Sequence, residues 1–268
     1  MRQSFLRSLF GGSRPAPAKP GPTGRSARPA GKKSGSTKPP FLFNQAVDQQ
    51  ARVIFVAIPK TGTTSIREQM KRPGADYMVR KPHLDIRQIH DGLRAYFWVK
   101  SMSKNKGFPT DIEAVPDAAE VTRTFEEFYA STFKFSTVRN PWARVASLYA
   151  RREGVQMAEG MDFDSFCLQI RYASDTCSVP TRHECQIDWL LDERGEMAMD
   201  YVMRLEDIDT DLPKLKDLSG RDFDIEVKQK NVNPTSMSRS YRDLYSQEAR
   251  DHIGAVFRRD IEAFGYSF

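Results

Sequence analysis

The segment that most constrains the fold of this chain is residues 53–66, where an apolar run of strand length breaks into a loop of small residues and then resumes as a helix-forming sequence. The run reads Val-Ile-Phe-Val-Ala-Ile, and the loop reads Pro-Lys-Thr-Gly-Thr-Thr-Ser. A strand, a small-residue turn and a helix start aim several backbone N–H groups and the positive end of a helix dipole at one point. The pattern therefore predicts a P-loop-like strand–loop–helix that binds a phosphate.

The side chains of this loop strengthen the prediction of an anion site. Lys60 supplies a mobile positive charge, and the hydroxyls of Thr63, Thr64 and Ser65 supply further donors. The lysine precedes the only glycine of the loop, Gly62, so the segment departs from the Gly-x-x-x-x-Gly-Lys-Ser/Thr pattern. An ordinary P-loop nucleoside triphosphatase is therefore a poor match.

A second candidate phosphate site follows in residues 133–149. A β-rich run ends just before Arg139, and Asn140 and Pro141 then have the residue types of a helix N-cap and a first helical position. Arg139 is therefore expected at the carboxyl end of a strand. Ser147 comes about two helical turns later, so a guanidinium and a hydroxyl could close on one phosphate.

Together, segments 59–65 and 138–147 resemble the two cofactor-binding motifs of the sulfotransferases that use 3′-phosphoadenosine 5′-phosphosulfate (PAPS). The resemblance is greatest to the carbohydrate branch, of heparan 2-O and chondroitin type, and to its soluble bacterial relatives. It implies that Arg139 and Ser147 bind the 3′-phosphate. It also implies that the 5′-phosphosulfate is bound by the whole first loop, namely Pro59, Lys60, Thr61, Gly62, Thr63, Thr64 and Ser65.

The resemblance extends over residues 50–268, where further marks of this branch follow in order: His83, the Gln-x-x-x-Leu segment 186–190, the Arg-Leu-Glu-Asp phrase 204–207 and the ending 260–266. It implies a transferase that moves a sulfuryl group from PAPS to a hydroxyl, on a carbohydrate or another small molecule, and releases the 3′,5′-bisphosphate PAP. No metal is expected.

In-line sulfuryl transfer requires a protein to align donor and acceptor, to take the acceptor's proton and to neutralise charge on the leaving phosphate. Lys60 is expected to neutralise that charge. His83 is expected to be the general base, because imidazole titrates near neutral pH. His183, in a loop rich in Arg and Cys, is the rival base.

Two other functions stay open. A nucleotide-dependent kinase is disfavoured, since the Walker lysine is absent and no acidic magnesium ligand stands at a strand end. A non-catalytic nucleotide-binding module docked by a basic tail is the other alternative, although such a protein would have no physical need to keep Lys60, His83, Arg139 and Ser147 together.

Strands alternate with helices after residue 40, which predicts an α/β fold with three layers, α/β/α, around a central, mostly parallel sheet. Residues 41–268 are expected to form a single sulfotransferase domain. The predicted elements include strands at 77–79, 133–138 and 197–203 and helices at 83–97, 125–129, 141–152, 164–172, 206–218 and 246–264.

Residues 1–40 differ from the rest in composition. They are rich in Pro, Gly and Ser and hold nine of the 41 basic residues and no acidic one, which leaves 32 basic against 35 acidic residues elsewhere. Such a basic segment is expected to be disordered. Its opening residues could instead touch a membrane surface weakly. No nucleic-acid partner is expected.

The compartment is predicted from two further features. The sequence has no apolar run of the ~18 residues that a spanning helix needs and no signal-peptide core, so a cytoplasmic enzyme is expected. Cys167, Cys177 and Cys185 are then expected to be free thiols, and their spacing does not fit a zinc site. Acceptor identity and oligomeric state are left open.

Overall fold

The computed structural model describes residues 40–102, 115–150, 160–169, 183–221, 225 and 240–268. Residues Lys38–Phe268 form one compact unit. The predicted disordered tail, Cys177 and parts of several predicted loops lie outside the described residues. None of the helices in those described ranges combines the length and the apolar character that a bilayer crossing requires.

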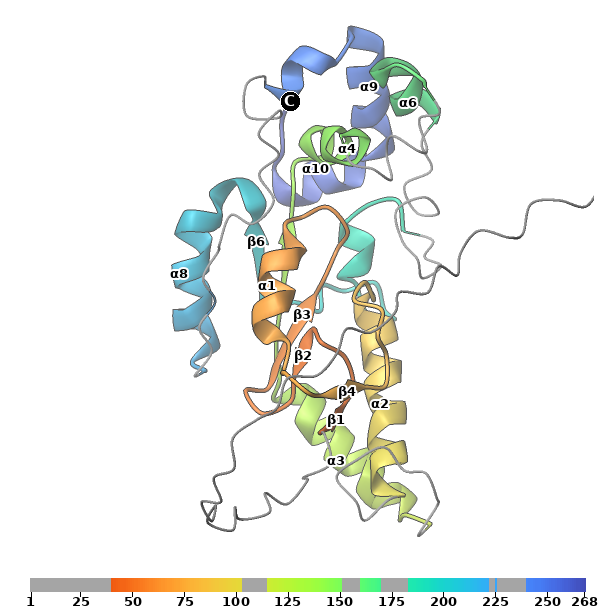
Figure 1. Ribbon diagram of the computed structural model, residues 1–268, viewed down its shortest axis with the longest axis vertical. Coiled ribbons are helices and arrows are strands. Elements are labelled where there is room, and N and C mark those ends of the chain that lie inside the picture. Colours follow the sequence, from red (N-terminus) through yellow and green to blue (C-terminus); the bar gives the residue numbers. More distant parts are fainter. Residues whose placement is uncertain (1–39, 103–114, 151–159, 170–182, 222–224, 226–239) are drawn as a thin grey trace, which may run out of the picture. The chain divides into compact units, whose positions relative to one another are not determined.

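A mostly parallel sheet lies at the centre of this unit (Figure 1). Across the described part of the chain its strand order is β2-β3-β5-β6, with β2 antiparallel to β3 and the other neighbours parallel. The strands are β2 (Val47–Asp48), β3 (Val53–Val56), β5 (Phe133–Val138) and β6 (Tyr201–Arg204). The carboxyl ends of β3, β5 and β6 therefore meet at one edge of the sheet.

Helices cover both faces of this sheet, because successive side chains of a strand point to opposite sides. From β3, Ile54 and Val56 pack in one core with α2 (Ile86–Ser101) and α3 (Ala118–Ala130). Val53 and Phe55 pack in another core with side chains of α1 (Thr63–Met70) and α8 (Ile208–Ser219). The three-layer α/β/α prediction is therefore confirmed (Figure 1).

A third core is mainly helical and begins where β5 ends, since α4 follows β5 closely (Figure 1). It joins α4 (Pro141–Tyr149), α6 (Phe163–Gln169) and α9 (Gln247–Val256), with partly buried residues of α10 (Arg258–Phe264) against it. Cys167 and Cys185 are unpaired, buried thiols in this core. Burial raises the pKa of Cys167 to about 12 and that of Cys185 to about 11.

Short elements complete the described fold. β1 (Phe41–Leu42) pairs in parallel with β4 (Asp76–Tyr77), and the 3₁₀ turns are η1 (Ile187–Trp189), η2 (Leu205–Asp207) and η3 (Tyr241–Leu244). The strand predicted at 77–79 therefore corresponds to β4, which pairs with β1 and not with the main sheet. The strand predicted at 197–203 begins only at Tyr201, because Met197 instead bridges back to Leu191.

Capping residues explain where the helix predictions were wrong at their ends. The helix predicted from residue 83 begins at Ile86, because Asp85 forms a capping box with Gln88. The helix predicted at 125–129 starts at Ala118, where the side chain of Asp117 caps it. The terminal helix predicted at 246–264 is interrupted at Phe257, whose φ of −103° and ψ of 25° separate α9 from α10.

Candidate active site

The loop between β3 and α1 has the backbone of an anion cradle. Lys60 and Gly62 both adopt positive φ, 72° and 79°. Gly62 is the N-cap of α1 but makes no side-chain cap, and the first turn of the helix, which contains Thr63, Thr64 and Ser65, carries no acidic residue. The first N–H groups of a helix have no partner within it. This helix start therefore suits a phosphate group.

The loop is tied to the neighbouring strand through buried hydroxyls. Thr61 Oγ1 donates to the carbonyl oxygen of Ile58 at 3.0 Å and lies 2.9 Å from Thr137 Oγ1 on β5. Because the Thr61 hydrogen goes to that carbonyl, Thr137 is the donor of the second bond. Arg139 Nη1 adds a longer bond of 3.4 Å to the Lys60 carbonyl oxygen. The two predicted phosphate motifs thus lie side by side.

Arg139 directly follows β5, and Asn140 caps the helix behind it as predicted. The Asn140 side-chain oxygen accepts from the N–H groups of Trp142 and Ala143, at 3.1 and 3.4 Å. Those donors of α4 are therefore already engaged by a capping side chain, whereas Gly62 has no side chain to cap α1. A phosphate at this strand end would depend on side chains, and the predicted ones are Arg139 and the half-buried Ser147 on α4.

His83 lies beside the same loop. Its Nδ1 is 2.6 Å from the carbonyl oxygen of Ala57, the residue that follows β3. A carbonyl oxygen only accepts, so Nδ1 must carry the hydrogen and the lone pair of the neutral ring is on Nε2. This tautomer leaves Nε2 as the atom able to take a proton.

His183 is held in a different way. Its Nε2 lies 2.8 Å from Asp85 Oδ2 and 3.2 Å from an Nη atom of Arg87. Burial raises the pKa of Asp85, but the hydrogen bonds from His183 and the Gln88 N–H outweigh it, so this pKa lies below its ordinary value. Since Asp85 caps α2, His183 supports the start of that helix, and its Nε2 is already engaged by a carboxylate.

Three residues outside the predicted site hold its backbone in place. Gln186, whose role the sequence left open, accepts from the Arg139 N–H at 2.9 Å and donates to the Arg139 carbonyl at 2.8 Å. Glu206 accepts from the Asn140 N–H at 2.8 Å. Arg144 is buried and donates to the Pro59 carbonyl at 3.1 Å. Membership in the family-like segments was the only signal for Gln186 and Glu206, and it did not reveal what they contact.

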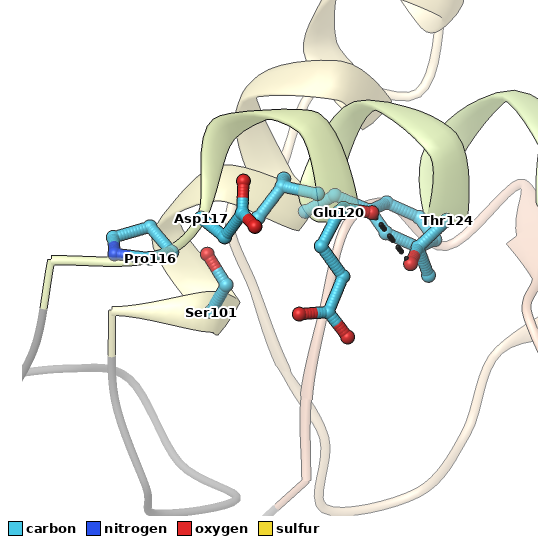
Figure 2. Close-up of a pocket in the computed structure, with 7 residues that line it drawn as sticks. Ser101, Pro116, Asp117, Glu120 and Thr124 are labelled. Atoms are coloured by element: carbon cyan, nitrogen blue, oxygen red, sulfur yellow. Dashed lines mark hydrogen bonds between the residues drawn. The ribbon is translucent and has the colours of Figure 1, made fainter.

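A pocket of about 300 Å³ lies elsewhere, where the end of α2 meets the start of α3 (Figure 2). Figure 2 shows Ser101 at the end of α2 and Glu120 and Thr124 on α3, where Thr124 Oγ1 donates to the Glu120 carbonyl at 2.8 Å. α2 is 16 residues long, which at 1.5 Å per residue separates this pocket by about 24 Å from the capping Asp85. The pocket is therefore distinct from the candidate active site.

The donors gathered at the strand ends suit an anionic ligand. In the part of the chain that the structure describes, no group of three or more His, Cys, Asp or Glu residues is arranged to hold a metal ion. A family model described as "Sulfotransferase family" matches residues 44–267, a range that contains both phosphate motifs, His83 and Gln186. Neither the curated proteins nor the solved structures gave a match.

Proposed function

Since the chain belongs to the sulfotransferase family, we propose that it transfers a sulfuryl group from PAPS to an acceptor hydroxyl, with His83 as general base. The observation that carries the proposal is the junction of the two phosphate motifs. The Thr61–Thr137 contact of 2.9 Å and the bond from Arg139 to the Lys60 carbonyl join them at one edge of the sheet.

The residues present fit a nucleotide with phosphates at two positions. The first turn of α1 supplies backbone N–H groups for the 5′-phosphosulfate, with the hydroxyls of Thr64 and Ser65 beside them. Arg139 and Ser147 would hold the 3′-phosphate, for which a guanidinium is well suited by its forked donors. When bound, PAPS supplies an activated sulfuryl group on a phosphate leaving group.

The remaining steps belong to the side chains around the loop. Lys60 would neutralise the charge that gathers on the leaving phosphate, as cationic groups do in phosphoryl transfer. His83 Nε2 would take the proton of the acceptor hydroxyl, because the bond from Nδ1 to the Ala57 carbonyl fixes the tautomer that this role requires. The acceptor is proposed to be a carbohydrate or another small molecule, on the resemblance of the motifs alone.

Isothermal titration of the full chain with PAP, with adenosine 5′-phosphate and with ATP in the absence of magnesium tests the proposal. We expect PAP to bind most tightly. Arg139→Ala should weaken the binding of PAP and change the binding of adenosine 5′-phosphate little. Arg139 would give the 3′-phosphate a charged contact that adenosine 5′-phosphate cannot make, and such a contact is worth about 1.5–3 kcal/mol. A preference for ATP, or no binding, would return the protein to the kinase or binding-module alternatives.

A further inference from the structure

A fully buried carboxylate on the last helix lies behind the candidate active site. Asp260, on α10, is 0% exposed. Its Oδ2 accepts from the Gln186 backbone N–H at 2.8 Å and from Gln186 Nε2 at 3.1 Å, and its Oδ1 accepts from the Ile187 N–H at 2.9 Å. Buried charges persist only when they are paired and hydrogen-bonded, so this carboxylate depends on the donors around it.

The first route from Asp260 leads to the predicted 3′-phosphate residue. Gln186 bonds both backbone groups of Arg139, at 2.9 and 2.8 Å, with one amide. Its Nε2 has two hydrogens, and the Arg139 carbonyl and Asp260 take one each. Asp260 and the Arg139 backbone therefore set the amide orientation together, since a flipped amide would bring its oxygen toward two acceptors.

The second route leads to the 5′-phosphosulfate loop. Arg144 is 1% exposed, and its guanidinium donates to the Pro59 carbonyl at 3.1 Å and to the Glu184 carbonyl at 3.5 Å. Burial raises the pKa of Asp260, and the nearby Arg144 guanidinium and the N–H donors work against that rise. Arg144 is thus bonded to the same 184–187 segment that Asp260 holds through the Gln186 and Ile187 N–H groups, and its charge favours the ionised form of that carboxylate.

We propose that Asp260 is a positioning residue that holds the two phosphate-binding segments in register, through Gln186 to Arg139 and through Arg144 to Pro59. The inference rests on the proposed function. Binding one nucleotide at two phosphates requires both segments at a defined separation, and misplacement by about 1 Å can cost up to ~10²-fold in rate. Asp260 itself touches neither phosphate site and acts through the other two side chains.

Affinity for PAP relative to adenosine 5′-phosphate is the readout, because a general loss of stability does not change this ratio. Gln186→Met keeps the volume but removes every side-chain bond to Arg139. We expect this variant to lower the affinity for PAP relative to adenosine 5′-phosphate by roughly tenfold. A loss of that size corresponds to one lost hydrogen bond between the displaced Arg139 and the 3′-phosphate. Asp260→Asn should lower the same affinity ratio. It should also weaken the binding of adenosine 5′-phosphate, because Arg144, which bonds the Pro59 carbonyl of the first loop, loses a nearby negative charge.

Asn44→Ala is the matched control for destabilisation. The Asn44 side chain is also a buried amide that bonds backbone groups, accepting from Ala46 N–H at 2.8 Å and donating to the Val79 and Lys81 carbonyls at 3.1 and 2.7 Å. It has no bond to either phosphate segment among these contacts. This variant should lose stability and keep the wild-type ratio.

The outcomes separate the two proposals. A wild-type protein without preference for PAP overturns the proposed function, and this inference with it, before any variant is made. A wild-type protein that prefers PAP, together with a Gln186→Met variant that keeps the preference, overturns the positioning role alone. The positioning role is also overturned if Asp260→Asn lowers the affinity for adenosine 5′-phosphate no more than Asn44→Ala does.

Discussion

Gly62 gives a sharp test of the phosphate-loop geometry, because the chain contains a matched glycine elsewhere. Its φ is +79°, and a Cβ added there would lie 2.6 Å from Leu205 Cδ1. Gly195, in a turn before β6, has a φ of +78°, and a Cβ there would meet nothing within 4 Å. Alanine at the two positions therefore carries the same backbone penalty but differs in one close contact.

The difference can be estimated from two separate terms. A left-handed conformation costs an L-residue roughly 1–2 kcal/mol, of which alanine recovers about 0.4–1 kcal/mol by restricting the unfolded chain. Gly195→Ala should thus lower the free energy of unfolding by about 1 kcal/mol. Carbon atoms rest about 3.5–4.0 Å apart, so the new methyl must displace Leu205 by roughly 1 Å. Because the displaced atom is the end of a partly exposed side chain, the added cost lies at the low end of the ~1–3 kcal/mol of overpacking, which gives about 2 kcal/mol for Gly62→Ala.

Urea unfolding of the wild type and of both variants measures these losses, and PAP titration follows the site. Gly62→Ala should also weaken PAP, because Leu205 and the loop must move apart, whereas Gly195→Ala should bind PAP as the wild type does. Leu205→Ala combined with Gly62→Ala should recover part of the loss, with a coupling free energy of about 1 kcal/mol. Equal losses of stability for Gly62→Ala and Gly195→Ala would refute the close approach.

Three further predictions concern charge and proton transfer. Lys60→Ala should abolish most sulfate transfer while the unfolding midpoint stays near that of the wild type, and an unchanged rate would remove the lysine from the mechanism. His83→Ala should slow transfer by about 10²–10⁴-fold, and His183→Ala, which removes a hydrogen bond to the capping residue of α2, should cost less; the reverse order would make His183 the base. The folded-state pKa of Asp85 lies below its ordinary value of 3.8, so its contribution to stability is present above that value and lost as the pH falls toward the folded-state pKa. The free energy of unfolding should therefore fall more steeply on acidification for the wild type than for Asp85→Asn, and parallel curves would contradict this pairing.

Local signals in the sequence were sufficient to predict the secondary structure of the two phosphate motifs. The β3–loop–α1 unit and the Asn140–Pro141 start of α4 lie where the sequence predicts them. Both depend on neighbouring residues alone: an apolar run, a glycine able to adopt positive φ, and an N-cap with proline behind it. Sequence also provided the alternation of strands and helices, and from it the three-layer fold.

Element ends and partners were less predictable. α3 extends well beyond the predicted 125–129, and the last helix breaks at Phe257, because the caps and the packing that set these ends come from particular side-chain geometry. The surroundings of the two candidate bases, His83 and His183, also came only from the structure. His83 contacts a loop carbonyl, whereas His183 contacts the carboxylate that caps α2.

By itself, the sequence of this protein determined where the two predicted phosphate segments lie, since each is built from residues close together in the chain. Only the tertiary structure decided how the two segments are held together. Gln186 bonds Arg139 across 47 positions and Asp260 across 74. The sequence around Gln186 or Asp260 does not indicate such a pairing. A buried hydrogen bond depends on where folding brings its two groups, and not on the residues next to either of them in the chain.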